Sequence, residues 1–555
     1  MKRILYVLLL LCTMLQMASC GTYESVHHRP PVVNYNTTVP IVEKHNDSTY
    51  TFENNFLIKN RYGLWEMYVE GDPYQRGMIS GALAHDLILH QEDAFMAKVK
   101  EIVPSKFKQS VLRQFLKWYN RKLHEHVPEE YLAEIYGISQ YASEEYDYVA
   151  PPYLRSLYLH AAHDIGHALT DLSMVGCTSF AVWDDKTQDG SLLIARNLDF
   201  YAGDEFAEDK IIAFVKPDTG YPFMSVVWGG MIGNLSGMNA KGLTVTINSG
   251  KSDIPLQAKT PISILSREIL QYAQNIDEAV AIAKKREVFV SESIMVGSAQ
   301  DHKAVLIEVS PNKFGVYEVP NSSQLICSNH FQSEAYSEDE NNKYAIENSH
   351  SQYRYEKMTE LLDTNEKVNP EDAAAIMRNT EGLNGIALGY GNEKAINQLL
   401  AHHSVIFKPE QRIVWVSANP YQLGEYVGYN LDDIFNKPHV RNLTSMAVER
   451  LTIAADPFLY TDAYKNYEQY RKEDRIIDAA IENKETLPLA FIETYQSHNP
   501  DFWEVYYKAG VYNYNRGYYT AAKAEFEKAL TKEITTVSDR EQLEDYLMKI
   551  KRKLK

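Results

Sequence analysis

The chain has 555 residues, of which 45% are hydrophobic, and its formal net charge is −18. This length is sufficient for several domains with a large hydrophobic core. The acidic charge and the absence of a basic stripe argue against a nucleic-acid-binding protein, because such proteins use Lys and Arg to displace counterions from phosphates.

Residues 1–19 have the pattern of an export signal. Lys2 and Arg3 precede an apolar stretch over 4–15 that is too short for a typical membrane-spanning helix. The residues before Cys20 resemble a bacterial lipobox, which implies that Cys20 is lipidated and becomes the mature N-terminus. We therefore expect a lipid-anchored protein of the bacterial cell envelope, at the outer membrane. An ordinary cleaved signal peptide is the alternative.

Two segments are expected between this signal and residue 177. Residues 20–50 are rich in Pro, Asn, Thr and His, which is typical of a flexible stalk. Residues 51–176 place apolar residues at three- and four-residue spacing, which predicts a mostly helical pro-segment after one short strand near 64–70. Gly77 and Gly81 are four residues apart and permit close packing against a backbone or a ligand.

The hydrophobic period changes at Cys177. Over 177–445, short strands with polar or glycine turns alternate with helical patterns, which predicts a layered α+β domain with helices covering sheets. Residues 456–555 are helical again. They carry a spacing similar to one tetratricopeptide unit, although Tyr506 and Asn513 depart from it. The matching residues are Gly510, Gly517, Tyr519, Ala522, Phe526 and Ala529. A single unit predicts a small helical cap or a site for a protein partner.

The residues around Cys177 suggest a nucleophile that begins a new chain. In Gly176-Cys177-Thr178-Ser179-Phe180, the thiol would attack the preceding carbonyl, and hydrolysis of the resulting thioester would free the Cys177 amine. Glycine before the scissile bond tolerates a distorted backbone. The released α-amine, with an unperturbed pKa of about 7.7, can then act as a base for its own side chain.

Several blocks resemble a known group of enzymes. Residues 176–180 and 196–200 (RNLDF) are similar to the choloylglycine hydrolase and acyl-CoA:6-aminopenicillanate acyltransferase families, which are cysteine Ntn hydrolases that include peptidase family C45. Residues 237–243 and 246–249 resemble the next block, and 70–77 resembles the start of the acyltransferase-type pro-segment. The resemblance spans 64–416. It implies self-cleavage between Gly176 and Cys177 and a four-layer αββα fold, preceded by the helical pro-segment and followed by the all-α TPR-like region.

The resemblance also implies roles for individual residues. Cys177 would be the nucleophile, Arg196 would stabilise its thiolate, and Asp199 would hold the α-amine. These roles agree with chemistry, because a cation lowers the pKa of a thiol and a carboxylate fixes an ammonium group. Asn248 would supply a side-chain N–H to an oxyanion hole.

Further site residues are expected downstream. Asn329 and Arg354 resemble the family's second asparagine block and a later arginine on the catalytic side. The expected lining of an acyl pocket is Phe200, Tyr201, Trp228 and Met231.

The expected substrate is an acyl amide, namely an N-acyl amino acid, a conjugated bile acid or an N-acyl lipid. The enzyme would hydrolyse it or transfer its acyl group without a cofactor, since both reactions share an acyl-enzyme. Two alternatives stay open. One is a phospholipase B-like esterase with the same nucleophile. The other is an uncleaved surface lipoprotein that binds a ligand or partner, with Cys177 in a disulfide to Cys327.

A metal site is a separate alternative. His160, His163 and His167 share one face of a predicted helix, and His402-His403 on a later strand could add a ligand. A helix face that makes hydrogen bonds in a core or interface is the default interpretation, so we expect no metal.

Overall fold

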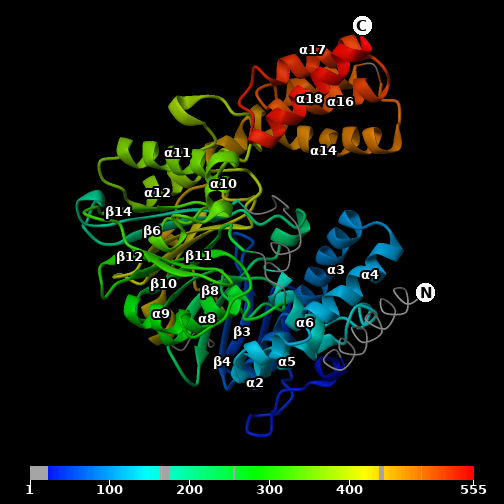
Figure 1. Ribbon diagram of the computed structural model, residues 1–555. Coiled ribbons are helices and arrows are strands. Elements are labelled where there is room, and N and C mark those ends of the chain that lie inside the picture. Colours follow the sequence, from blue (N-terminus) through cyan, green and yellow to red (C-terminus); the bar gives the residue numbers. More distant parts are fainter. Residues whose placement is uncertain (1–22, 163, 165–175, 254–256, 437–442, 489) are drawn as a thin grey trace, which may run out of the picture.

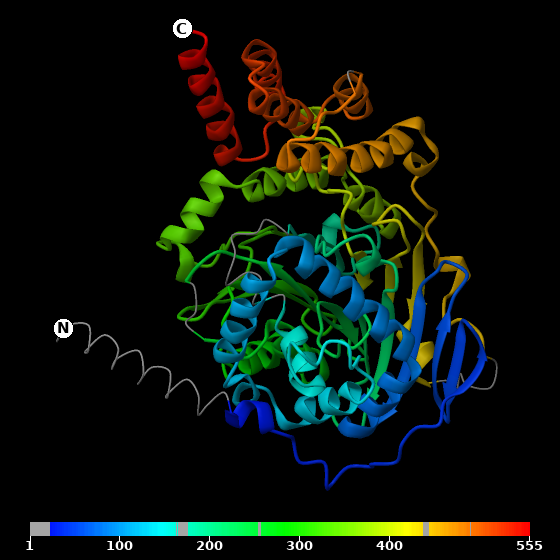
Figure 2. The same cartoon turned by 90° about the vertical axis from the view of Figure 1, so that its right-hand side faces the viewer.

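The computed structural model describes residues 23–162, 164, 176–253, 257–436, 443–488 and 490–555. Within these residues, two β-sheets face each other between layers of helices (Figure 1). The C-terminal helices stand at one end of this body (Figure 2). Cys20 and the rest of the predicted export signal lie outside the described residues.

The larger sheet joins strands from both sides of residue 177. Its order is β1 (Glu43–Asn46), β2 (Thr49–Phe52), β3 (Asn55–Lys59), β4 (Trp65–Gly71), β7 (Ile211–Pro217), β8 (Phe223–Val227), β9 (Ser236–Asn239), β10 (Leu243–Ser249), β11 (Glu292–Ser298), β12 (Lys303–Val309) and β13 (Phe314–Tyr317). Neighbouring strands are antiparallel except β4 and β7, which are parallel from Trp65↔Ile211 to Gly71↔Pro217. The upstream segment is therefore part of the sheet.

The smaller sheet is antiparallel. Its order is β14 (Gln324–Cys327), β5 (Thr178–Val182), β6 (Leu193–Leu198), β15 (His403–Lys408), β16 (Ile413–Ser417) and β17 (Tyr426–Asn430). Strand β5 begins directly after Cys177, with β14 on one side and β6 on the other. Cys327 on β14 and Arg196 on β6 both pair with Ser179 on β5. Residues distant in the sequence therefore meet at this end of the sheet.

Alternation along the strands produces the layers, because successive side chains point to opposite faces of a sheet. Ala181 on β5 and Ile194 on β6 pack between the two sheets. Their neighbours Phe180 and Ala195 pack outward with Met358 against the helices of the smaller sheet. Those helices include α10 (Glu340–Asn348), α11 (Ser351–Thr364) and α12 (Pro370–Met377). The outer face of the larger sheet is covered by α8 (Ile262–Tyr272) and α9 (Ile276–Ala283). The predicted αββα arrangement is confirmed.

The upstream helices cover the part of the larger sheet around β4. They are α2 (Pro73–Leu83), α3 (His85–Ile102), α4 (Lys106–Tyr119), α5 (Glu129–Ser139) and α6 (Pro152–His160). Helix α2 starts where the Asp72 side chain accepts a hydrogen bond from the Gln75 backbone N–H, a favourable N-cap. A Cβ at Gly77 would lie 2.0 Å from the Glu134 carbonyl oxygen, so glycine permits the close approach of α2 and α5.

The structure differs from the expectation for residues 20–71. The expected stalk over 20–50 contains β1 and the start of β2, and the expected helical pro-segment over 51–176 begins with strands through Gly71. For β3, burial explains the difference: Phe56, Leu57 and Ile58 are all buried, so a strand forms where the sequence suggested a helical segment.

The C-terminal region comprises α14 (Asp462–Asn483), α15 (Phe491–His498), α16 (Trp503–Asn515), α17 (Tyr519–Ala529) and α18 (Val537–Lys553). Helices α16 and α17 pack closely, and a Cβ at Gly510 would come 2.5 Å from the Phe526 ring. The region contacts the loop over 388–400, where the Tyr467 hydroxyl donates to the Leu399 carbonyl at 3.2 Å. Its assignment as TPR-like stays a prediction.

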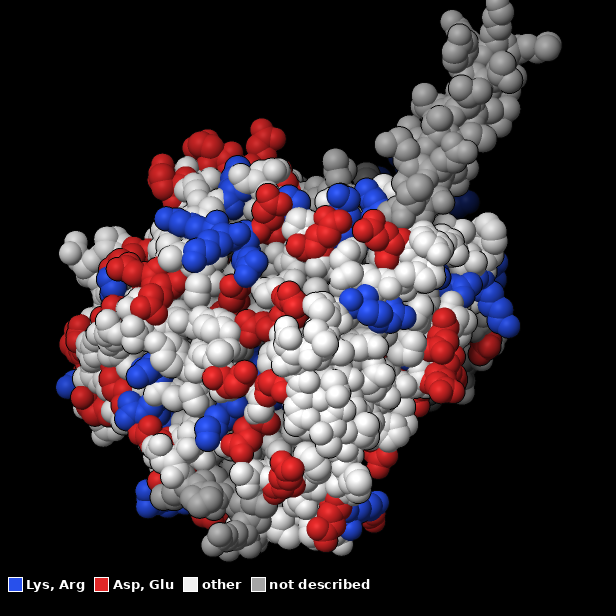
Figure 3. Space-filling model, turned by 90° about the horizontal axis from the view of Figure 1, so that it is seen from below, with Lys and Arg blue, Asp and Glu red and all other residues white. Residues whose placement is uncertain are grey.

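Charge is mixed over the surface. In the view from below, Asp and Glu are interspersed with Lys and Arg, and no continuous basic surface is visible on that face (Figure 3). No helix in the described ranges has both the length and the apolarity needed to cross a membrane.

Candidate active site around Cys177

Cys177 lies buried at the start of β5, with 1% of its surface exposed. Side chains alternate along a strand, so the Cys177 side chain points to the same side as Ser179 and Ala181 and faces the larger sheet. Thr178 faces the helices over the smaller sheet. The nucleophile predicted from the sequence is therefore placed between two walls, one from each side of β5.

Arg196 forms the wall on the side of the larger sheet. Its Nη2 donates to the Cys177 Sγ at 3.4 Å and also to the Ile247 carbonyl, while its Nη1 donates to the Ser236 Oγ at 2.7 Å. These backbone and hydroxyl acceptors fix the guanidinium beside the sulfur. Burial raises the pKa of the Cys177 thiol, and the charge of Arg196 opposes that rise.

Arg354 from α11 forms the opposite wall. Its Nη1 donates to the Cys177 carbonyl at 2.8 Å and to the Thr178 Oγ1 at 2.6 Å, and its Nη2 donates to the Asn329 Oδ1 at 2.6 Å. Asn329 in turn donates to the Ser249 carbonyl at 2.9 Å. The structure thus brings Arg354 to the peptide of Cys177, and it links Asn329 to that peptide through Arg354.

Asn248 lies on β10, with its amide engaged by backbone. Its Nδ2 donates to the carbonyls of Cys327 at 3.1 Å and Ser328 at 3.3 Å, and its Oδ1 accepts from the Ser179 Oγ at 3.4 Å. The residue borders the site as expected. Its predicted role as an oxyanion donor stays a prediction.

Asp199 is a buried carboxylate beside the 176–177 peptide. Its backbone carbonyl accepts the Gly176 N–H at 3.2 Å, and neither carboxylate oxygen has a hydrogen-bond partner among the described residues. Burial raises the pKa of Asp199 to about 8, although the charges of Arg354 and Arg196 lower it. A buried carboxylate without a hydrogen bond is costly, so this position suits a cation that the uncut chain does not provide.

Gln398 is a site residue that the sequence did not reveal. Its side-chain Nε2 donates to the Gly176 carbonyl at 3.5 Å, the carbonyl that self-cleavage would attack. A Cβ at position 176 would lie 2.6 Å from that same nitrogen, which gives Gly176 a second reason to be glycine. No local motif marks Gln398, because the contact joins residues 222 positions apart.

A second missed group continues from Arg196 into the core. The Ser236 Oγ, which accepts from Arg196, also bonds the His403 Nε2 at 2.9 Å, and His403 bonds His402 between their Nδ1 atoms at 2.8 Å. Burial holds the pKa of both imidazoles well below the ordinary value. The two histidines thus support the guanidinium as neutral hydrogen-bonding groups.

The metal and disulfide alternatives can be compared with the described residues. His160 uses Nδ1 with the Ser156 carbonyl at 2.8 Å and Nε2 with the Ile232 N–H at 2.9 Å, so both nitrogens are engaged. The other two histidines of that predicted face, His163 and His167, lie outside the described residues. Among the residues described, no group of three potential ligands is arranged to hold a metal ion. Cys177 and Cys327 are both free thiols.

Two hollows lie near the site. An apolar one with a cavity volume of about 40 Å³ is lined by Phe200, Trp228, Met231 and Leu235, and the rings of Phe200 and Trp228 stack with centroids 6.0 Å apart. An open groove of about 520 Å³ runs between α3, the 201–205 loop and α14. Gln398 and Tyr201 line this groove. The predicted acyl-pocket residues therefore divide between the two hollows.

Part of the chain is similar to a known protein family. Residues 186–420 match the family model described as acyl-coenzyme A:6-aminopenicillanic acid acyl-transferase. An uncharacterized protein of Archaeoglobus fulgidus is 26% identical over 343 residues, 54% of this chain and 55% of that protein. Protein dcd1B of Dictyostelium discoideum is 22% identical over 271 residues, 45% of this chain and 51% of that protein. The chain thus spans about half the length of the curated relatives it matches.

Similar solved structures include a Caenorhabditis elegans ortholog of N-acylethanolamine-hydrolyzing acid amidase, at 17% identity and a TM-score of 0.31 over 42% of this chain and 93% of that one. A mutant of conjugated bile acid hydrolase from Clostridium perfringens is 15% identical, with a TM-score of 0.31 over 48% of this chain and 94% of that one. The family match over 186–420 includes Arg196, Asp199 and Arg354. Over these residues the chain is similar to the acyl-coenzyme A:6-aminopenicillanic acid acyl-transferase family.

Proposed function

We propose that this protein is a self-processing enzyme that cuts its own chain between Gly176 and Cys177 and then uses Cys177 as the N-terminal nucleophile of an acyl-amide hydrolase or acyltransferase. The observation that carries the proposal is the buried carboxyl group of Asp199 beside the 176–177 peptide, which has no hydrogen-bond partner among the described residues. Cleavage creates an α-ammonium group at this place. The missing cation is thus a product of the reaction itself.

The contacts of the 176–177 peptide support self-processing. The Cys177 sulfur attacks the Gly176 carbonyl carbon, the peptide nitrogen takes the thiol proton, and the C–N bond breaks to leave a thioester. Gln398 donates to the Gly176 oxygen, where negative charge develops. Water then hydrolyses the thioester, which frees the Gly176 carboxylate and the Cys177 thiol and amine. Asp199 binds that amine and stabilises the ammonium form that the amine takes when it accepts a proton.

The mature enzyme uses the same groups on a substrate. The α-amine of Cys177 accepts the thiol proton, and Arg196 stabilises the thiolate through its contact with the sulfur. The thiolate attacks the acyl carbonyl, the leaving amine takes the proton, and an acyl thioester remains. Water or an acceptor amine then releases the acyl group. Arg354 keeps the Cys177 peptide in place through its carbonyl.

The apolar hollow supports an apolar acyl group in the substrate. Aromatic and aliphatic side chains line its wall, which favours contact with an aliphatic or sterol-like acyl group over a charged one. The candidates are an N-acyl lipid, an N-acyl amino acid and a conjugated bile acid. We place the enzyme in the bacterial cell envelope, attached through lipid at Cys20.

The test is a turnover assay with acyl amides of these three kinds, together with a mass spectrum of the protein during turnover. We expect amine release and an acyl adduct on the fragment that begins at Cys177, both absent in Cys177→Ala. Turnover of acyl esters without amides would identify a phospholipase B-like esterase instead. A protein that turns over neither and stays uncut would be a binding protein.

A further inference from the structure

We propose that α4 is an interfacial helix that docks this protein onto a membrane surface containing anionic lipid. Nothing in the proposed chemistry at Cys177 uses this helix. It lies at the outer edge of the molecule, beyond α3 and away from the sheets (Figure 1).

The helix exposes large apolar side chains on one face. Phe107 is 78% exposed, Val111 54% and Trp118 37%. Their spacing of four and seven residues places them along one stripe of a helix. Ile102, the last residue of α3, lies just before this helix and is also exposed, at 44%. A soluble surface gains nothing from such a stripe, so it indicates a contact with another apolar phase.

Positive charge flanks the stripe. Between Glu101 and Glu125 the sequence holds six Lys or Arg residues and neither Asp nor Glu, in a chain whose net charge is −18. Lys106 and Lys117 are eleven residues apart, which places them on a common strip next to the apolar stripe. Neither has an ion-pair partner among the described residues. Exposed cations beside exposed apolar groups match an anionic lipid surface, which offers both complements.

Length and position favour a membrane surface over a spanning role or a protein groove. The 14 residues of α4 extend about 21 Å, short of the roughly 30 Å of a hydrocarbon core, so the helix lies in the plane of the interface. The Arg121 guanidinium lies 4.7 Å from the centroid of the Trp118 ring in a cation–π contact. Such a pair of residues suits the lipid headgroup region.

The start of the described chain lies beside the same helix. Val26 packs against the same cluster as Phe115 and Leu116, which anchor α4 to the body. The predicted lipid attachment at Cys20 precedes Tyr23, the first described residue, by three positions. A lipid chain alone gives weak anchoring, and a basic amphipathic surface next to it supplies the second contact that stable binding needs.

Docking through α4 also orients the open groove. Lys98 and Glu101 on α3 line this groove together with Gln398, whose amide reaches the Gly176 carbonyl. The groove therefore opens next to the lipid surface, and an N-acyl lipid reaches the nucleophile from the membrane. This consequence, unlike the docking itself, rests on the proposed function.

The docking is tested with the full chain on vesicles of phosphatidylglycerol and phosphatidylcholine, with brominated acyl chains as quenchers of tryptophan fluorescence. We expect quenching that Trp118→Phe largely removes. The Cys177→Ala variant should show the same quenching, so a failure of the proposed chemistry leaves this result unchanged. Quenching that is absent, or equal in Trp118→Phe, would overturn the proposal.

A variant pair measures the contribution of the stripe. Phe107→Asp combined with Val111→Asp should weaken vesicle partitioning tenfold or more. Each change removes an apolar side chain that the lipid would bury and adds a charge. The control is Tyr344→Asp, which alters an aromatic residue 66% exposed on α10. Equal partitioning of the two would contradict the proposal. A dimer that the double variant abolishes in solution would identify a second copy of the chain as the occupant instead.

Discussion

At the scale of single residues, the least expected feature is the charge state of Asp199. A carboxyl group with a pKa of about 8 is protonated over most of the neutral range, whereas an ordinary Asp is ionised there. The cause is burial, without a hydrogen-bond partner in the part of the chain that the structure describes, and the nearby Arg354 and Arg196 only partly offset it. The uncut chain therefore bears a cost that grows as this group ionises.

This cost predicts a pH dependence of stability. Because the folded-state pKa lies above the unfolded value, the group stabilises the fold fully below pH 3.8, and this contribution is lost as pH rises to about 8. The comparison uses uncut Cys177→Ala protein with and without Asp199→Asn. The free energy of unfolding of the protein that keeps Asp199 should fall more steeply with rising pH, by up to about 1.4 kcal/mol per pH unit over that interval. Urea unfolding at several pH values measures it. Parallel curves for the two proteins would contradict the account, since other buried carboxyls contribute equally to both.

Gln398 gives a second prediction at this scale. Gln398→Met keeps the length of the side chain but removes the N–H that reaches the Gly176 oxygen. We expect self-cleavage to slow by about a hundredfold, as for the loss of one oxyanion donor. The rate is followed by gel electrophoresis of freshly refolded protein. Gln140→Leu, at an exposed position, serves as the control, and cleavage of Gln398→Met at the wild-type rate would refute the role.

At the scale of elements, strand β4 decides what happens after cleavage. It belongs to the segment before Gly176, yet it pairs with β7 over seven residues and connects β1–β3 to the rest of the larger sheet. Separating the two fragments would expose this ladder and the buried side chains upon it.

We therefore predict that the two fragments stay together after self-cleavage. Gel filtration in native buffer should give one peak that contains both, and separate peaks should appear only in denaturant. Separate elution in native buffer, with retained helical and strand circular dichroism in the fragment that begins at Cys177, would show that the upstream segment is a removable peptide.

The elements also show where sequence periodicity succeeds. Strand β10 alternates apolar and polar residues over seven positions, and short strand patterns of this kind predicted a layered domain after Cys177. Strands β1–β3 have four or five residues each and lie among Asn, Asp and Thr, which favour turns. Such short segments have too little periodicity for prediction. Their pairing with one another makes them strands, together with the packing of α2 on β2 and β3.

The candidate site divides in a similar way. Cys177, Arg196 and Asp199 lie within 23 residues, so a local motif identified all three. Asn329 and Arg354 were reached through the family resemblance. Gln398, Ser236 and His403 carry no local signal, because their contacts with the site arise only when distant strands and loops pack together.

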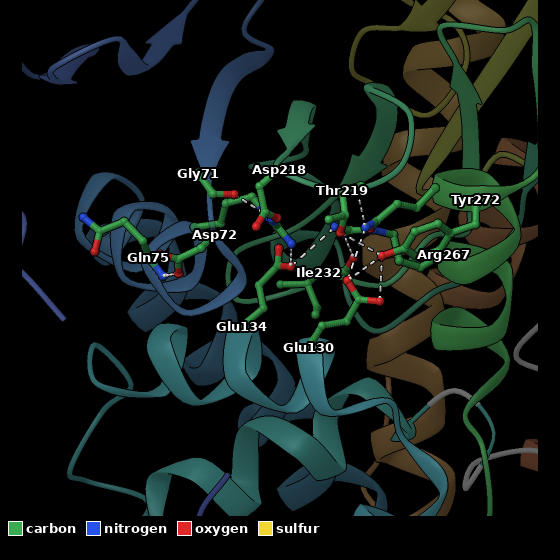
Figure 4. A network of polar contacts seen from close by, with 12 residues as sticks. Gly71, Asp72, Gln75, Glu130, Glu134, Asp218, Thr219, Ile232, Arg267 and Tyr272 are labelled. Atoms are coloured by element: carbon green, nitrogen blue, oxygen red, sulfur yellow. Dashed lines mark hydrogen bonds and ion pairs between the residues drawn. The ribbon is translucent and has the colours of Figure 1, made fainter. Parts of the chain in front are cut away.

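At the scale of the whole molecule, a buried ionic network ties the upstream segment to the body. Glu134 on α5 accepts from the Arg76 Nη2 at 2.7 Å and from the Arg267 Nη2 at 3.4 Å, with all three side chains almost fully buried (Figure 4). Arg76 and Glu134 precede the cleavage site, and Arg267 follows it. The network therefore joins the two fragments that cleavage would create.

Loss of its central carboxylate should destabilise the protein. Glu134→Gln leaves two buried guanidinium groups without their shared counter-charge, and we expect a loss of about 3 kcal/mol in the free energy of unfolding. Glu101→Gln is the control, because its partner Lys98 forms a solvent-exposed pair that contributes little. Denaturant unfolding measures the free energy of unfolding of both variants. Equal values for Glu134→Gln and Glu101→Gln would show that the network is not required for stability.

The most direct test of the central claim is the intact mass of the purified protein beside that of Cys177→Ala. The account predicts two masses from the first protein, with the break between Gly176 and Cys177, and one uncut mass from the variant. A single uncut mass from both would contradict self-processing and the role given to Asp199.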